Sequence, residues 1–167
     1  DASGTGCLDL NSRDWSDEIL LALDVKKSIC PEIVEPNQSI GSWCGVPLFL
    51  AGGDQGANGV GTGVVDSTSI GLALGSSGVT CAVLDKPRFH ELGTLNCFCN
   101  VPGGYHAMAV TQNCGTALSA ASQSYFGGIS ADKLSELAES ACASSELLFA
   151  PWFSGERCPI RSSNPNP

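Results

Sequence analysis

The chain has 167 residues, of which 43% are hydrophobic and 15% are charged, and its formal net charge is −9. This composition excludes a disordered polyelectrolyte, because it offers enough apolar side chains for a core, and no apolar run approaches the roughly 20 residues of a membrane span. The 17 acidic residues outnumber the 8 basic ones, and no basic cluster exists beyond Lys26-Lys27. We therefore do not expect nucleic acid as a partner.

The first 43 residues predict a glycine-broken loop, one helix and a second loop. Ser16 is placed to cap a helix that runs to about Val25 and packs on the core. Pro31 and Pro36 break regular structure, which predicts a loop as far as Trp43.

The stretch at residues 46–63, VPLFLAGGDQGANGVGTG, is the most informative part of the chain. Its apolar start at residues 46–51 predicts a buried strand, and Gly52-Gly53 end it. Asp54 lies at the turn, before a small-residue helix expected over residues 55–65. In α/β folds, reactive groups lie outside the carboxyl ends of strands. The alternative is that Asp54 caps the helix, and the stretch alone leaves both interpretations open.

Residues 69–74 and 79–84 predict two strands of a hairpin joined by Gly-Ser-Ser-Gly. The turn offers backbone N–H groups and two hydroxyls, a set that suits an anionic phosphate. It is not a P-loop, because no Gly-Lys-Ser/Thr follows. The residues of this candidate phosphate cradle are Gly75, Ser76, Ser77 and Gly78.

The remaining chain predicts a second hairpin, two helices and a tail. Residues 95–101 and 105–111 bracket Pro-Gly-Gly and form the hairpin. A helix is expected over residues 115–125, and Ser130 caps another. From about residue 162 the polar, proline-rich tail is expected to be disordered.

The nine cysteines are odd in number and irregular in spacing. This pattern argues against a secreted disulfide framework, and the N-terminus lacks the features of a signal peptide. We therefore expect reduced, structural thiols in a cytoplasmic protein. Cys97 and Cys99 have no second cysteine pair, and the chain holds only two histidines, so no zinc site is expected.

Several short segments, in this order, make the chain resemble the FGGY family of carbohydrate kinases, most closely its xylulokinases. They are DASGT at residues 1–5, AGGDQ at 51–55, GVVD at 63–66, LGSSG at 74–78 and SGERCP at 154–159. The second is similar to the family's AGGGD segment, which carries the catalytic aspartate. Ser76 replaces the usual threonine and keeps its hydroxyl, whereas Asn100 stands where a histidine is common.

The resemblance implies an α/β fold of two RNase H-like lobes, of the actin and hexokinase ATPase type, with the active site between them. Residues 1–65 would be the C-terminal part of the first, sugar-side lobe. Residues 66–167 would be the N-terminal part of the second lobe. The chain lacks the family's upstream phosphate loop and its downstream adenosine motif, so it is expected to be an internal fragment.

The activity that the resemblance implies is ATP-dependent phosphorylation of a sugar hydroxyl, most closely D-xylulose to D-xylulose 5-phosphate. Asp54 would be the general base and Gln55 would bind the sugar. The Gly-Ser-Ser-Gly turn would hold the nucleotide phosphates, with Mg²⁺ bridging phosphate oxygens and no protein ligand assigned to it. The implied partners are the sugar and ATP, without nucleic acid or membrane, and a homodimer of the full-length enzyme is allowed.

Two alternatives to a xylulokinase stay open. One is another FGGY kinase, for gluconate, ribulose or glycerol, because the sugar-selecting residues of the family lie mostly outside this chain. The other is a truncated, non-catalytic sugar- or nucleotide-binding remnant, which the absence of both flanking nucleotide motifs favours. Retention of Asp54 and of the serine turn counts against the remnant. By itself the chain is expected to be inactive.

Overall fold

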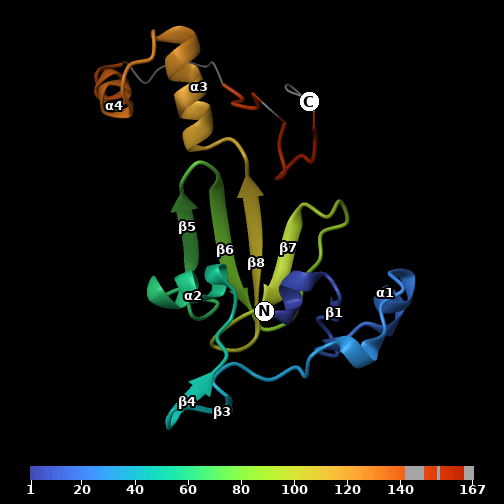
Figure 1. Cartoon of the computed structure of the whole chain (residues 1–167). Helices are drawn as coiled ribbons and strands as arrows, with labels where there is room; N and C mark the ends of the chain where they lie inside the picture. The colour runs from blue at the N-terminus through green and yellow to red at the C-terminus, as the bar shows by residue number, and fades with distance from the viewer. Residues whose placement is uncertain (142–148, 154, 164–167) are drawn as a thin grey trace. The chain divides into compact units, whose positions relative to one another are not determined.

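The structure is a computed structural model that describes residues 1–141, 149–153 and 155–163 (Figure 1). It divides into two compact units, which we describe separately. Unit 1 consists of Asp1–Gly71, Cys81–Phe89 and Asn96–Met108, and unit 2 of Leu72–Thr80, His90–Leu95 and the described part of Ala109–Pro167. Over the described ranges, every helix is too short or too polar to cross a membrane. The lobe boundary near residue 65 stays a prediction.

Unit 1 begins with the short 3-10 helix η1 (Ala2–Thr5) and the antiparallel pair β1 (Leu8–Asp9) and β2 (Asp14–Trp15). Helix α1 (Asp17–Ala22) and the 3-10 helix η2 (Lys27–Ile29) follow. The predicted cap is confirmed, because the Ser16 hydroxyl accepts the Ile19 N–H at 3.3 Å. The helix ends at Ala22, earlier than expected, and Leu20 is its one buried side chain.

The antiparallel strands β3 (Ser39–Trp43) and β4 (Val46–Phe49) correct two predictions. The expected loop to Trp43 ends earlier, because Cys44 and Gly45 adopt positive φ angles of 50° and 80°. Such a two-residue turn lets the flanking strands pair. The strand expected to be buried is exposed, with Val46 at 63%, because within the described residues it pairs with β3 alone, in a two-stranded sheet.

Helix α2 (Asp54–Gly61) follows β4, with Gly53 as its N-cap. The expected helix after the double glycine is confirmed, and it ends at Gly61 rather than near residue 65. Gly52 and Gly56 lie against the Val101 side chain: a β-carbon on Gly56 would be 3.0 Å from Val101 Cγ2, and one on Gly52 would collide with it. The small residues therefore permit a close approach between α2 and the chain after β7.

A four-stranded sheet has the order β5-β6-β8-β7. Its strands are β5 (Ile70–Leu74), β6 (Gly78–Leu84), β7 (Leu95–Cys99) and β8 (Tyr105–Thr111). Neighbouring strands run in opposite directions (Figure 1). Both predicted hairpins are confirmed. Strand β8 lies between two partners, and it holds the buried side chains Tyr105, Met108 and Val110.

Unit 2 also contains α3 (Gly115–Tyr125) and α4 (Ala131–Ser140), as predicted. The Ser130 hydroxyl caps α4 by accepting the Lys133 N–H at 3.3 Å. Ser162, at the start of the tail that is expected to be disordered, forms a backbone bridge with Glu156, and the disorder of the tail stays a prediction. The backbone N–H and carbonyl of each residue pair with those of the other, at 2.8 and 2.9 Å. Residues 164–167 of that tail, and Ser154 of the SGER segment, lie outside the described residues.

Candidate active site

Asp54 is exposed and is the first residue of α2. One carboxylate oxygen accepts the N–H of Gln55 at 2.7 Å. Its other oxygen, and the side-chain amide of Gln55, have no hydrogen-bond partner in the part of the chain that the structure describes. Gly53 rather than Asp54 is the N-cap residue. The arrangement leaves one carboxylate oxygen free to accept a proton from a hydroxyl group.

A second carboxylate, that of Asp1, lies beside the turn before Asp54. Its Oδ2 is so close to Gly53 that a β-carbon on that glycine would be 3.1 Å away. Its Oδ1 accepts the N–H and the hydroxyl of Ser3, at 3.0 and 2.6 Å. The Ser3 hydroxyl in turn accepts the N–H of Cys99 at 3.0 Å, which ties η1 to β7. Sequence reasoning did not single out Asp1, although the DASGT segment was the available signal.

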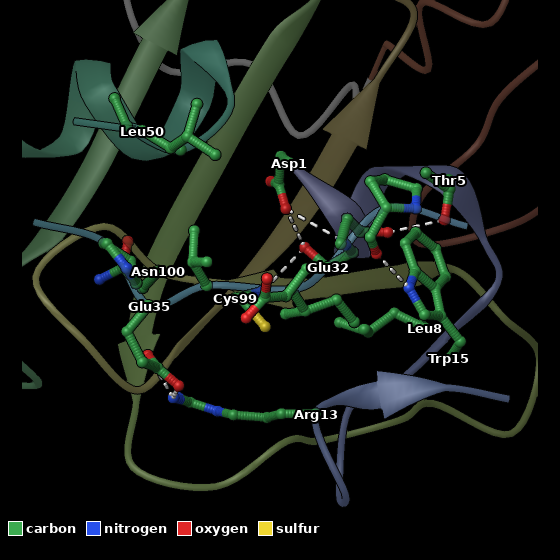
Figure 2. Close-up of a pocket in the computed structure, with 18 residues that line it drawn as sticks. Asp1, Thr5, Leu8, Arg13, Trp15, Glu32, Glu35, Leu50, Cys99 and Asn100 are labelled. Atoms are coloured by element: carbon green, nitrogen blue, oxygen red, sulfur yellow. Dashed lines mark hydrogen bonds and ion pairs between the residues drawn. The ribbon is translucent and has the colours of Figure 1, made fainter. Parts of the chain in front are cut away.

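A pocket of about 330 Å³ opens in unit 1 next to this turn (Figure 2). Gly52 is part of its wall, whereas Asp54 is not. The wall comes from η1, β1, β2, the segment at residues 31–36, the chain after β4 and the end of β7. Its titratable or amide side chains belong to Asp1, Arg13, Glu32, Glu35, Cys99 and Asn100.

Arg13, which precedes β2, and Trp15, in β2, form hydrogen bonds that hold the pocket wall in place. The Arg13 guanidinium forms an ion pair with Glu35 at 3.1 Å and donates to the Tyr105 hydroxyl at 3.2 Å. The Trp15 indole N–H donates to the Pro31 carbonyl at 2.9 Å. Figure 2 shows the Arg13–Glu35 ion pair and the Trp15–Pro31 hydrogen bond among the residues that line the pocket. The positive charge of Arg13 is therefore already paired, and the acidic side chains dominate the charge of the pocket.

Asn100 supplies an unpaired donor to the pocket wall. The residue is 4% exposed, and its Nδ2 has no hydrogen-bond partner among the described residues. A buried amide without a partner is costly, so this group is available to an acceptor atom of a ligand or to a water molecule.

The Gly-Ser-Ser-Gly turn in unit 2 fits the phosphate cradle that the sequence predicts. Its residues 75–77 are exposed, and the N–H groups and hydroxyls of Ser76 and Ser77 form no hydrogen bond with the described residues. The Gly75 and Ser76 carbonyls accept the first two N–H groups of α3, from Gly115 at 2.9 Å and Thr116 at 3.2 Å. The positive end of the α3 dipole therefore lies beside the turn, where it favours an anion.

The last residue of the turn, Gly78, is buried. A β-carbon there would lie 2.8 Å from the Thr111 side chain. Glycine at this position lets the turn pack directly on the end of β8.

A metal site is not assigned. In the described ranges, no group of three or more His, Cys, Asp or Glu could hold an ion. The eight cysteines in these ranges are free thiols, and Cys142 lies outside them.

The structure thus brings the predicted site residues together in two groups. Asp54 and Gln55 lie at the start of α2 in unit 1, beside Asp1 and the pocket. Residues 75–78 lie in unit 2, beside the start of α3. Each group has the donors or acceptors expected of it, and its role in catalysis remains a prediction.

Two curated xylulose kinases resemble the chain over nearly its whole length. Xylulose kinase of Escherichia coli (strain K12) is 35% identical over 175 residues, which cover 95% of this chain and 35% of that protein. Xylulose kinase of Lactococcus lactis is 31% identical over 95% of this chain and 34% of its own length.

The chain is a homologue of the xylulose kinases. It spans about a third of the length of these curated xylulose kinases. No family model matches the chain.

Solved structures show that the mixed α/β fold of the homologue matches part of the xylulose kinase fold. A ligand-bound xylulose kinase from Lactobacillus acidophilus has a TM-score of 0.86 and 27% identity, over 97% of this chain and 36% of that one. Xylulose kinase from Bifidobacterium adolescentis has a TM-score of 0.80 and 26% identity, over 100% and 37%. A gluconate kinase from Lactobacillus acidophilus also matches, with a TM-score of 0.86 and 27% identity over 97% and 36%. The assignment to particular lobes stays a prediction.

Proposed function

We propose that this homologue of the xylulose kinases takes part in the ATP-dependent phosphorylation of a sugar hydroxyl, with D-xylulose as acceptor and D-xylulose 5-phosphate as product. The observation that carries the proposal is the 35% identity to a xylulose kinase over 95% of the chain. That stretch includes both Asp54 and the Gly-Ser-Ser-Gly turn.

Asp54 acts as the general base in this proposal. Its unpaired carboxylate oxygen takes the proton of the sugar hydroxyl while the hydroxyl oxygen attacks the γ-phosphorus of ATP and ADP leaves. Gln55, directly beside it and also unpaired, binds a second hydroxyl of the sugar. Both side chains start from the rigid first turn of α2, which fixes their spacing.

The turn at residues 75–78 holds the nucleotide phosphates. The amides and hydroxyls of Ser76 and Ser77 donate to phosphate oxygens, and the N-terminus of α3 adds positive potential. When bound, ATP supplies the transferred phosphoryl group. Charge neutralisation by Mg²⁺ belongs to the same reaction class, and none of the described side chains is assigned to it.

The charge of the unit 1 pocket favours a neutral sugar as acceptor. The pocket wall carries three carboxylates, those of Asp1, Glu32 and Glu35, and one cation, Arg13. Arg13 is already paired with Glu35. Carboxylates accept hydrogen bonds from sugar hydroxyls but repel the carboxylate of gluconate. The likeness to a gluconate kinase structure keeps gluconate as the second candidate.

Titration of the chain with ATP, D-xylulose and gluconate, followed at the backbone amide signals, tests the proposal. We expect ATP to shift the amide signals of Ser76, Ser77 and Gly78. D-xylulose should shift those of Asp54 and Gln55, with gluconate weaker. Shifts for gluconate alone would support the second candidate. If neither D-xylulose nor gluconate shifted these signals, the proposed sugar contacts of Asp54 and Gln55 would be wrong.

The role of Asp54 is tested by Asp54→Ala in a protein that contains this segment and phosphorylates D-xylulose. Loss of a general base lowers the turnover number by about 10²–10⁴-fold. ATP affinity should stay nearly unchanged, because the phosphates bind at residues 75–78. Asp85→Ala, at an exposed aspartate outside the proposed site, is the matched control. A turnover number close to that of the unsubstituted protein would rule out the assignment of the base.

A further inference from the structure

The Glu156 carboxylate is a buried junction in unit 2 that the proposed mechanism does not use. The residue is 3% exposed. Its Oε2 accepts the Thr111 hydroxyl at 2.6 Å and the Asn113 side-chain amide at 3.0 Å. Its Oε1 accepts the N–H of Gln112 at 2.8 Å and that of Arg157 at 2.7 Å. All four donors bond to the same carboxylate, so hydrogen bonds stabilise its negative charge.

The charged form of Glu156 is the stable one in this environment. Burial alone would raise its pKa, but the hydrogen bonds from Thr111, Asn113 and the backbone lower it to about 2. Hydrogen bonds to a charged group are the strong ones, and a buried carboxylate that lost them would be costly. The junction is therefore a rigid anchor at neutral pH.

The anchor holds the turn between β8 and α3. Asn113 also donates to the Gly155 carbonyl at 2.7 Å. Thr111 and Asn113 therefore both bond to the segment that contains Gly155 and Glu156. Gly155 has a φ of 89°, and a β-carbon on it would collide with the Ser162 carbonyl. Only glycine therefore allows the chain to pass close enough for the carboxylate to meet these donors.

The same turn fixes the phosphate cradle. Gly115 and Thr116, which follow it directly, donate their N–H groups to Gly75 and Ser76. The Thr116 hydroxyl also donates to the Ser76 carbonyl, at 3.0 Å. The methyl group of Thr111 lies against Gly78, the last residue of the cradle. One side of the turn thus contacts Glu156, and the other contacts the cradle.

We propose that Glu156 is a positioning residue for the phosphate cradle at residues 75–78, and that it acts through the turn between β8 and α3 and the first two residues of α3. The inference rests on the proposed function only in naming ATP as the ligand of the cradle. Glu156 forms no hydrogen bond with residues 75–78, so its effect is on the geometry of the N–H and hydroxyl donors. The chemistry that it serves is recognition of a nucleoside triphosphate.

The test uses the full chain with Glu156→Gln and reads two quantities. Glutamine keeps the shape, but its amide group must face two hydrogen-bond donors. We expect amide hydrogen exchange at Gly115 and Thr116 to become about tenfold faster or more, because a charged hydrogen-bond set is lost. ATP affinity, measured by the signals of Ser76 and Ser77, should weaken by about the same factor.

Two controls separate positioning from general destabilisation. Glu91→Gln removes an exposed carboxylate from unit 2 and should change neither quantity. Leu20→Ala opens the core of unit 1 and lowers overall stability without touching the anchor. If Glu156→Gln does not fold, Thr111→Val carries the test, because it removes one donor and keeps the methyl group against Gly78.

Unchanged exchange at Gly115 and Thr116 in a folded Glu156→Gln chain would overturn the inference. So would a loss of ATP affinity no larger than that of Leu20→Ala. If the unsubstituted chain bound no ATP, the proposed function would fail, and the exchange measurement without ligand would still decide whether Glu156 positions the cradle.

Discussion

Two buried side chains of unit 1, Asn100 and His106, each carry a nitrogen that has no hydrogen-bond partner among the described residues. Because these side chains are buried, protonation or ligand binding there changes the free energy of folding more than it would at an exposed site. His106 is 3% exposed, and its ring lies 5.6 Å from that of Phe98. Burial lowers the pKa of His106, because the imidazolium form would lose its hydration.

The lowered pKa of His106 predicts a pH dependence of the free energy of unfolding. The unfolded chain takes up a proton near the ordinary pKa of about 6.5, whereas folded His106 resists it. The contribution of neutral His106 is therefore fully present above that value and is lost as the pH falls below it. Urea unfolding between pH 8 and pH 5 should show this loss.

His106→Gln is the variant that isolates the pH effect, since it cannot titrate. Its absolute stability is irrelevant, and only the slope of stability against pH is compared. His90→Gln is the control, because His90 is exposed. An equal slope in His106→Gln and the unsubstituted chain would show that another group causes the dependence.

At the scale of elements, local signals placed the helices well. Ser16 and Ser130 cap α1 and α4 as predicted, because a cap needs only a hydroxyl and an N–H three residues later. The exposure of the strand side chains, by contrast, could not be predicted from the local sequence. On β5, Ile70, Leu72 and Leu74 are 71%, 66% and 71% exposed, although their apolar character alone would place them in a core.

The cap of α4 gives a prediction at this scale. Ser130→Ala should lower the stability of the helix by about 1 kcal/mol, because the Lys133 N–H loses its acceptor. Amide exchange in the first turn of α4 measures the effect. Ser135→Ala, inside the same helix, is the control and should be neutral or slightly stabilising, since alanine has the higher helix propensity. Equal exchange rates in both variants would contradict the capping role.

At the scale of the whole molecule, the chain covers 35% of the Escherichia coli xylulose kinase. It contains the candidate base and the phosphate cradle, but not the two flanking nucleotide motifs that the family resemblance implies. The 167-residue chain by itself should therefore bind ATP weakly and show no xylulose-dependent ADP release. A coupled ADP assay on the purified chain checks this prediction, and release above a control without sugar would refute it.

The sequence by itself predicted most of the helices, both hairpins of the four-stranded sheet and the likeness to the xylulose kinases. Caps, turn glycines and the order of short motifs act over a few residues, so they can be read along the chain. The same motifs pointed to Asp54, Gln55 and residues 75–78 as site residues, and these roles stay predictions.

Only the tertiary structure decided which distant residues meet. The pocket joins Asp1, Glu35, Gly52 and Asn100, and the Glu156 carboxylate reaches Thr111 across 45 positions. It also showed that β4 is exposed and that Ser162 pairs with Glu156. Such contacts depend on packing between segments that are far apart in the chain, and no local pattern of hydrophobicity or turn residues encodes them.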